Sequence, residues 1–522
     1  MYKKILLLLT VVCILAACNR TSPDKTVTID RATMTDKVKG AWAGKMIGVM
    51  YGRPMEFACN DRMYTDSIKW EPENVVASLN EDDIYGQMCF MSTIERLGLD
   101  APIDSLAHDF AYAGFGLCHA NLQGRKNYLD GLRGDEISTP ANNIHCDDID
   151  FQIECDFIGF INPCMPLSAD SLCERVGAVM SAGDGLYAGM YVSALHTLAY
   201  NCSDIDSIVV KALDAIPADS EYAAVIRDVI DCHRANPDDW TAAWTMLNER
   251  YAPYDVCSPY LPFNIDAKLN GAYIVTGLLY GGGDWTRTMN ITVGCGQDTD
   301  CNTANAAAVL GIIDGYDAIP EHFKSGIPAI ADEVFSHTDY SFNKAVEVTL
   351  DLMAQSIERN GGHVTDSQFV IKSQQPQAPA YVAGHGTLKL AEALPVAEPG
   401  RLAFTGNWVD WAYGEGDDDP YKVSTTPGDR LDVEFDGTGI AILGSWHTDS
   451  GRARATIDGT EVKDVDTYYI TNVGKWQGNR AYLYFVTGLP AGHHTLRFEN
   501  LPERNPASTG NKLYVERVLV YE

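Results

Sequence analysis

The sequence predicts a multidomain protein in which an all-α domain is followed by an all-β sandwich. Helical periodicity recurs in blocks over residues 35–361, for example in "EYAAVIRDVIDCHRA" and "DDWTAAWTMLNERY". Over residues 398–522 apolar and polar residues alternate around glycine turns, as in "RLDVEFDGTGIAILGS". The chain has 522 residues, of which 46% are hydrophobic, and this is enough for two or three domains.

Residues 1–18 have the pattern of a lipoprotein signal peptide. A basic start at Lys3 and Lys4 precedes an apolar run that is too short for a good membrane-spanning helix, and "LAAC" ends the run at Cys18. We expect lipidation of Cys18, export, and attachment to a membrane facing the periplasm or the surface of a bacterium. A plain cleaved signal peptide is the alternative, and it also takes the protein out of the cytoplasm. The polar residues 19–34 predict a tether.

The first helix of the helical domain, "TDKVKGAWAGKMIGVMYG", has a candidate cap at Thr35 or Asp36. Glycine recurs every fourth residue at Gly40, Gly44 and Gly48, and each glycine costs up to about 1 kcal/mol in a helix interior. The pattern predicts that a neighbouring helix or backbone approaches this face closely.

The C-terminal part divides into a linker and the sandwich. Residues 362–397, including "SQQPQAPA", predict a linker with room for one or two strands. The sandwich resembles the jelly-roll, galactose-binding-like accessory domains of exported carbohydrate enzymes. Its aromatic residues suit either sugar binding or core packing, and they are Trp408, Trp411, Tyr413, Trp446 and Trp476. The module is therefore expected to bind glycan or to pack against the helical domain.

Composition excludes some classes of function. The formal net charge of -32 argues against a nucleic-acid partner, because phosphate binding needs a basic face. The 14 cysteines form no CxxC pair and no Cys/His spacing of the zinc-site type. Buried apolar cysteines are the default interpretation, and a few disulfides are an alternative in an oxidising compartment. There is no Ser/His/Asp signature, phosphate loop or EF-hand.

Two aspartates stand between a glycine turn and an alanine-rich run in "VGCGQDTDCNTANAAAVLG". Residues two apart on a helix point in different directions, so Asp298 and Asp300 converge only if the turn at Gly294 and Gly296 precedes the helix. The alternative is an ordinary helix start, where aspartate is a common cap.

Two further acidic segments stand near the N-terminus. Glu81, Asp82 and Asp83 open a helix in "NEDDIYGQMCFM", and Glu56 closes the turn "GRPMEF". A solvated helix start and a surface glutamate are the alternatives. Taken together with Asp298 and Asp300, these segments supply carboxylate oxygens without His or paired Cys. Such oxygens suit Mg²⁺, Mn²⁺ or Ca²⁺ rather than zinc.

In their order and style, these three segments resemble the ADP-ribosylglycohydrolase family. "GRPMEF" is similar to the family's G-x-P-x-E turn, "EDDI" to part of its T-D-D-T motif, and "GQDTDCNTANAAAVLG" to its late G-G-D-T-D-T signature and alanine-rich helix. The resemblance covers roughly residues 35 to 355. It implies an all-α orthogonal bundle that holds two Mg²⁺ ions in a cleft.

The resemblance also implies roles by position. The expected metal ligands are Glu81, Asp82, Asp83, Asp298, Asp300 and Cys301, and the expected catalytic residues are Glu56, Asp83 and Asp300. Glu81 and Cys301 stand where the family has threonine, and Val49 stands where it often has aspartate. Metal ions in such a site would hold the ribose hydroxyls and a water against the anomeric carbon.

Four other polar residues are candidate substrate contacts. Gln152 and Asp156 are spaced i, i+4, so one helix face would point both into the cleft. Asp184 lies in "SAGDGLY", which predicts a loop between helices, and Asn302 follows Cys301. A satisfied structural group is the alternative for these positions.

The predicted function is an exported, metal-dependent glycosidase that cleaves an N- or O-glycosidic bond at a ribose-like anomeric carbon. The resemblance implies ADP-ribose on a protein or small molecule as the substrate. The alternatives are a glycosidase directed at a furanoside or glycan on the same scaffold, and a sugar- or nucleotide-binding lipoprotein without catalysis.

Overall fold

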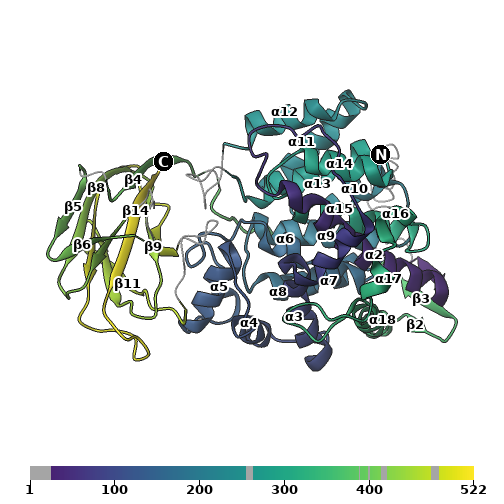
Figure 1. Cartoon of the computed structure of the whole chain (residues 1–522), viewed down its shortest axis with the longest axis horizontal. Coiled ribbons are helices and arrows are strands. Elements are labelled where there is room, and N and C mark those ends of the chain that lie inside the picture. Colours follow the sequence, from purple (N-terminus) through teal and green to yellow (C-terminus); the bar gives the residue numbers. More distant parts are fainter. Residues whose placement is uncertain (1–24, 254–262, 387, 398–399, 413–419, 472–480) are drawn as a thin grey trace, which may run out of the picture.

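The computed structural model describes residues 25–253, 263–386, 388–397, 400–412, 420–471 and 481–522. Figure 1 shows a helical domain with a sandwich of strands beside it, as the sequence predicts. Cys18, the signal peptide, Tyr413 and Trp476 lie outside the described residues, so the expectations made for them are not addressed by the structure.

The helical domain consists of α-helices joined by short connections. The helices are α2 (Arg31–Gly52), α3 (Asp82–Leu97), α4 (Ile103–Ala111), α5 (His119–Leu129), α6 (Asp150–Glu154), α7 (Asp156–Phe160), α8 (Pro166–Gly177), α9 (Asp184–Ala199), α10 (Ile205–Ala212), α11 (Glu221–Ala235), α12 (Trp240–Arg250), α13 (Ala267–Gly281), α14 (Trp285–Gly294), α15 (Thr299–Asp314), α16 (Glu321–Lys324), α17 (Ile327–Ile330) and α18 (Phe342–Arg359). Short 3₁₀ segments are η1 (Arg53–Met55), η2 (Pro72–Asn80), η3 (Gly134–Ile137) and η4 (Leu213–Ala215).

Helix α2 begins four residues before the predicted cap. Asp30, not Thr35 or Asp36, is the N-cap, and its carboxylate accepts a hydrogen bond from the backbone N–H of Thr33 at 2.9 Å. Asp36 instead accepts a hydrogen bond from the N–H of Asp317 at 3.0 Å, beyond the end of α15. The sequence offers several aspartate and threonine residues that could cap this helix. The helix begins after the first of them, Asp30, which is also the last residue of the preceding strand.

The glycine face of α2 packs directly on α15, which confirms the predicted close approach. A Cβ added at Gly40, Gly44, Gly48 or Gly52 would lie 2.1–2.5 Å from a backbone oxygen of α15. No side chain fits between backbones this close. The two helices therefore run in direct contact from Gly311 down to Thr299.

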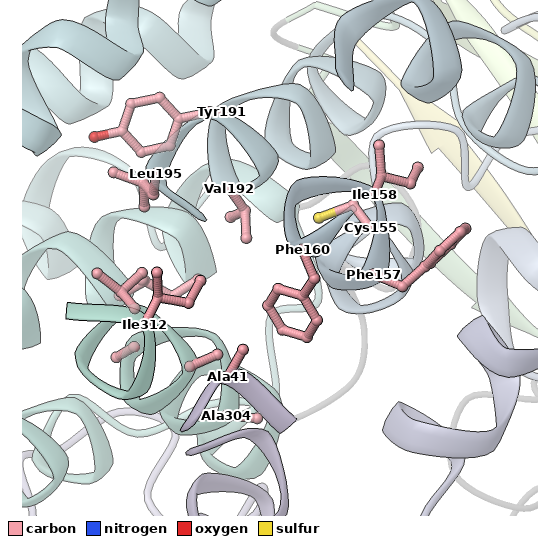
Figure 2. Packing of buried hydrophobic residues seen from close by; sticks show 14 of the residues in the cluster. Ala41, Cys155, Phe157, Ile158, Phe160, Tyr191, Val192, Leu195, Ala304 and Ile312 are labelled. Carbon is pink, nitrogen blue, oxygen red and sulfur yellow. The ribbon is translucent and has the colours of Figure 1, made fainter. Parts of the chain in front are cut away.

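The α2–α15 pair lies within the main apolar core. Figure 2 shows residues of this core at close range; those labelled are Ala41, Cys155, Phe157, Ile158, Phe160, Tyr191, Val192, Leu195, Ala304 and Ile312. The Trp42 ring meets Phe160 edge-on with ring centroids 5.3 Å apart, and its indole N–H donates to Thr349 Oγ1 at 2.9 Å. The core holds this helix pair in place from several sides.

A small sheet joins the two ends of the helical domain. Strand β1 (Thr26–Asp30) pairs antiparallel with β3 (Gln368–Lys372), and β3 pairs with β2 (His363–Val364). Part of the expected tether is thus a strand, and the expected linker contains β2 and β3. Strand β1 is polar at alternate positions, and it pairs with residues of β3 that lie more than 300 positions away in the chain.

Two antiparallel sheets form the sandwich. One has the order β11-β10-β13-β8-β5 and the other the order β12-β9-β14-β7-β6, with β4 paired to β14. The strands are β4 (Leu390–Pro395), β5 (Leu402–Thr405), β6 (Trp408–Trp411), β7 (Tyr421–Ser424), β8 (Arg430–Gly437), β9 (Gly439–Ser445), β10 (Arg452–Ile457), β11 (Thr460–Asp466), β12 (Ala481–Val486), β13 (Gly492–Asn500) and β14 (Leu513–Tyr521). The sandwich therefore begins at Leu390, within the segment expected as linker.

The described tryptophans of the sandwich mainly pack within it. Trp446 is buried, with 3% of its surface exposed. Trp408 packs edge-on against Phe404, and Trp411 packs edge-on against Tyr421. Core packing, one of the two interpretations of these residues, accounts for these contacts.

The sandwich packs against the helical domain around α5 (Figure 1). Leu122 of α5 belongs to the apolar cluster of the sandwich, and Ile144 clusters with Leu443 of β9 and Tyr482 of β12. The Lys126 ammonium lies 5.6 Å from the centroid of the Trp446 ring. The two domains thus share apolar cores.

Within the described parts of the chain, no helix combines the length and apolar character needed to cross a membrane. The cysteines of these parts form no disulfide with one another, and most of them are buried. Buried packing, the default interpretation, therefore holds for most of the described cysteines.

Candidate functional site

The three acidic segments meet in one pocket of the helical domain. Glu56 follows η1, Asp82 and Asp83 open α3, and Asp298 precedes the first turn of α15; all line a pocket of about 120 Å³. In the sequence, Asp298 lies more than 200 positions from the other three residues. The meeting of helix starts and one turn is the arrangement that the sequence motifs predict.

Asp83 and Asp300 lie close together, with Cys301 beside them. One ligand atom each from Asp83, Asp300 and Cys301 lies within 4.8 Å of the others, and all three residues are buried. Asp298, at 4% exposure, lies on the same helix start. Asp83 Oδ1 and Asp298 Oδ1 have no hydrogen-bond partner. Buried oxygens without partners are expensive unless a cation or water satisfies them.

A strained turn fixes Asp298 beside Glu56. Gln297 (φ 60°) and Phe57 (φ 51°) both have positive φ, a conformation that costs about 1–3 kcal/mol in a non-glycine residue. The Phe57 N–H donates to the Gln297 carbonyl at 2.9 Å, and Gln297 Nε2 donates to the Asn60 carbonyl at 2.6 Å. The segment after Glu56 and the segment before Asp298 are therefore tied together, and strain of this kind is common at functional sites.

Helix α2 anchors the same helix start from the other side. Thr299 Oγ1 donates to the carbonyl of Gly52 at 2.8 Å. A Cβ on Gly52 would lie 2.5 Å from the Asp300 Cα. The last glycine of α2 thus sets the position of Asp300.

Burial and mutual repulsion raise the pKa values of these carboxyl groups. Burial raises the pKa of Asp83 to about 6 against the opposing charge of Lys45, and burial raises the pKa of Asp298 to about 7. The pKa of Asp300 lies well above its usual range because of burial and then the charges of Asp298 and Asp83. Burial, followed by the charges of Asp300 and Asp83, raises the pKa of Glu56 to about 8. A divalent cation would relieve this repulsion.

The donor set fits a hard divalent cation. Asp83, Asp298 and Asp300 offer buried carboxylate oxygens, two of which lack a hydrogen-bond partner, and such oxygens are the ligands that Mg²⁺ and Ca²⁺ prefer. Asp82 is exposed and lines the pocket, so it can complete the set. Cys301 also lines the pocket, but burial raises the pKa of its thiol well above the usual value, and a thiol is a poor ligand for these ions.

Glu81 is placed differently from the expectation that it ligates metal. Its carboxylate pairs with the Arg53 guanidinium, and it does not line the pocket. A glutamate side chain is longer than threonine and reaches past the site to this arginine. Its extra charge is thereby neutralised outside the metal cluster.

The four residues expected to contact substrate bond to other parts of the helical domain, while Gln152 Nε2 and Asn302 Oδ1 are buried without a hydrogen-bond partner. Gln152 Oε1 accepts from Tyr222 Oη at 3.1 Å, and Asp156 pairs with Lys45 at 2.6 Å. Asp184 is the first residue of α9, not part of a loop, and accepts from the Tyr222 N–H at 3.1 Å. Asn302 Nδ2 donates to Asn270 Oδ1 at 2.8 Å. None of these four residues lines the pocket, in part because the helix breaks at Cys155 between Gln152 and Asp156.

The pocket is also lined by two acids that are not among the residues predicted from the sequence. Asp150 accepts from the Asn121 N–H at 3.0 Å, and Glu154 accepts from Asn121 Nδ2 at 3.0 Å. Burial raises the pKa of Asp150 to about 7 and that of Glu154 well above its usual value. These two acids have the same i, i+4 spacing as Gln152 and Asp156, so spacing alone favours neither pair.

With this geometry described, comparison with known proteins decides the family. The family model described as ADP-ribosylglycohydrolase matches residues 30–353. The chain belongs to the ADP-ribosylglycohydrolase family. The matched residues include α2, α3 and α15, which carry the acidic pocket. Membership supports a glycohydrolase-like function, and members of this family often use divalent metals.

Solved structures resemble the chain at low identity. A structure titled "ADP-ribosylglycohydrolase-related protein complex" has 14% identity and a TM-score of 0.44, and covers 62% of this chain and 99% of that chain. A Paenibacillus xanthan lyase has 21% identity and a TM-score of 0.19, with coverage of 30% and 15%. A family 35 carbohydrate-binding module from an environmental isolate has 14% identity and a TM-score of 0.19, with coverage of 24% and 90%. Among curated proteins no match is found. The family assignment rests on the family model.

Proposed function

We propose that this ADP-ribosylglycohydrolase family member is a metal-dependent glycosidase that hydrolyses an N- or O-glycosidic bond at a ribose-like anomeric carbon. The observation that supports this is the buried group of Asp83, Asp298 and Asp300, two of them with an unpartnered oxygen, beside Glu56. Mg²⁺, with Mn²⁺ or Ca²⁺ as alternatives, would be held by these aspartates and Asp82, and it would polarise and orient the substrate oxygens and water.

Glu56 is the residue best placed to move a proton. Its raised pKa, about 8, lets it hold or release a proton near neutral pH, which is what a general acid or base requires. In the overall reaction the water oxygen bonds to the anomeric carbon, the glycosidic bond breaks, and the leaving group takes up a proton. Asp150 and Glu154, which also line the pocket, could form hydrogen bonds with sugar hydroxyls.

The decisive experiment compares turnover with and without metal. ADP-ribosyl-arginine and a p-nitrophenyl furanoside are offered to the purified chain in Mg²⁺ and in chelator. We expect hydrolysis of one of them only with metal, and a loss of at least about 100-fold in Asp298→Asn and Asp300→Asn. The matched control is Asp317→Asn, an exposed aspartate beyond the end of α15. Full activity in both site variants would refute the proposal, and binding without turnover would favour a non-catalytic sugar-binding protein.

Export and anchoring are a second part of the proposal. The basic start, apolar run and "LAAC" ending at Cys18 support a bacterial lipoprotein. We expect the protein to partition into detergent with the membrane fraction, and Cys18→Ala to abolish metabolic labelling with palmitate. Unchanged labelling of Cys18→Ala would contradict lipidation at this residue.

A further inference from the structure

A second cluster of metal-ligand type borders the pocket and has a different chemistry. His119, at the start of α5, lies with His145 and Asp148, and one ligand atom from each of the three lies within 4.8 Å of the others. All three are buried, with 8%, 4% and 0% of their surfaces exposed. Neither Glu56 nor the aspartates of the acidic group belong to this cluster, so the proposed glycosidase chemistry leaves it unexplained.

The spacing of the donor atoms suits a small tetrahedral ion. His145 Nδ1 lies 2.8 Å from Asp148 Oδ2, and His119 Nδ1 lies 3.5 Å from the same oxygen. Zinc bonds of about 2.0–2.1 Å in tetrahedral geometry place neighbouring ligand atoms about 3.3 Å apart. The two observed distances lie on either side of that value. A bound ion could therefore contact all three donor atoms without a large movement of the side chains.

One ring nitrogen of the buried His119 is left unsatisfied. Its Nδ1 points toward Asp148 but has no hydrogen-bond partner, although the side chain is only 9% exposed. The residue also has positive φ, at 44°, a conformation that histidine adopts more often than most non-glycine residues. A buried ring nitrogen that lies against a carboxylate without a hydrogen-bond partner needs an explanation, and a bound cation would supply one.

Backbone hydrogen bonds and ring packing hold the segments that carry the ligands in place. The Ile149 N–H donates to the Ile265 carbonyl at 3.1 Å, the Ala267 N–H donates to the Asp147 carbonyl at 3.0 Å, and the His145 ring packs edge-on against Tyr482 of the sandwich.

We propose that His119, His145 and Asp148 form a transition-metal site of the zinc class on the wall of the acidic pocket. Two imidazoles and a carboxylate select Zn²⁺ or Co²⁺ over Mg²⁺, whereas the aspartate group selects the reverse. Three protein ligands leave a coordination position open, and His119 itself lines the pocket. Metal binding at His145 Nδ1 requires the tautomer protonated on Nε2, so a proton directed from Nδ1 to Asp148 would move to Nε2 by exchange with solvent and the ring would stay neutral. This inference is independent of the glycosidase proposal.

Cobalt and zinc titration of the full-length chain tests the site. With excess Mg²⁺ present to occupy the acidic group, we expect one Co²⁺ per chain, with visible d–d bands and no near-ultraviolet thiolate band, displaced by Zn²⁺. His119→Asn and Asp148→Asn are expected to weaken Zn²⁺ binding by at least about 100-fold, beyond the 10–100-fold typical of losing a partner outside the ligand sphere. Asp300→Asn and the exposed histidine variant His108→Asn are expected to retain the site.

Each outcome of these titrations either supports or overturns the proposed site. Asp148→Asn preserves side-chain shape, so it carries the test if His119→Asn fails to fold by circular dichroism. Unchanged Zn²⁺ affinity in a folded variant, a thiolate band in the cobalt spectrum, or no binding to folded wild-type chain would each overturn the proposal. Loss of the site in Asp300→Asn would mean that the metal occupies the acidic group instead, and would overturn it equally.

Discussion

Lys45 illustrates how a single side chain keeps the acidic pocket in place. It is fully buried, 2.6 Å from Asp156 and 4.0 Å from Asp83. Burial alone would lower the pKa of its ammonium group, but the charges of Asp156 and then Asp83 raise it above the usual value. The sequence gives no local signal for this role. Its role depends on α6 and α7 folding over α2.

Replacement of Lys45 by methionine is expected to be costly. Lys45→Met leaves Asp156 and Asp83 buried without their cation, and removal of one partner of a buried pair costs about 3–5 kcal/mol of unfolding free energy. Denaturant titration without metal measures the loss. Lys39→Met on the same helix is the control, since Lys39 is partly exposed, and we expect a change within about 0.5 kcal/mol. Equal effects of the two substitutions would contradict this account.

The pKa of Glu56 predicts an unusual dependence of stability on pH. Native Glu56 holds its proton up to about pH 8, whereas an unfolded glutamate releases it near 4.5. Between these values the native state binds more protons, so the unfolding free energy of the metal-free chain falls as pH rises. Thermal unfolding across this range should show the fall, and Glu56→Gln should reduce its slope. A metal-free chain that gains stability over the same range would contradict the prediction.

Bound metal is expected to reverse this dependence of stability on pH. A divalent cation binds only ionised carboxylates, so protons compete with it at Asp83, whose pKa is about 6, and at Asp298, whose pKa is about 7. The increase in melting temperature that Mg²⁺ produces is therefore expected to grow from about pH 5 to about pH 8. Asp298→Asn is expected to reduce this pH dependence of the Mg²⁺ effect, whereas the exposed Asp317→Asn is expected to leave it unchanged.

At the scale of elements, α2 and α15 are the pair that positions the chemistry. From the sequence one can predict that some backbone packs closely against the glycine face of α2. The glycines do not indicate that this neighbour is α15. The sequence predicts the acids at helix starts better, because glycine turns, capping residues and apolar runs are local signals. It does not predict the helix break at Cys155, which turns Asp150 and Glu154 toward the pocket and Gln152 and Asp156 away from it.

Two alanine substitutions on the glycine face separate packing from metal binding. Gly52→Ala and Gly40→Ala place a Cβ 2.2 and 2.1 Å from backbone oxygens of Thr299 and Gly311. Both are expected to destabilise the fold by about 1–3 kcal/mol, as overpacked cores do. Only Gly52→Ala displaces Asp300, so only this variant should weaken Mg²⁺ binding measured by calorimetry. Equal Mg²⁺ affinities in the two variants would show that α2 does not set the ligand position.

At the scale of the whole molecule, the sandwich and the helical domain share buried surface. Ile144 is completely buried among Leu443 and Tyr482 of the sandwich. The sequence shows that Leu443 and Tyr482 lie on strands with an apolar face, but not which face meets a helix. We therefore expect the wild-type chain to unfold in one calorimetric transition and Ile144→Asp to unfold in two. Ile470→Asp, at a half-exposed position of the sandwich, is the control, and two transitions in the wild type would contradict the prediction.

The sheet of β1 and β3 has a consequence for the architecture of the chain. Thr26 lies opposite Lys372, and the Ser373 N–H donates to the Lys25 carbonyl at 3.0 Å, so the helical domain receives and releases the chain at neighbouring points. Domains with adjacent ends tolerate circular permutation and insertion into host loops. The acidic pocket therefore lies in a domain whose two ends adjoin. This domain could be inserted into a loop of a host protein through these ends, and the α2–α15 pair inside it would stay uncut.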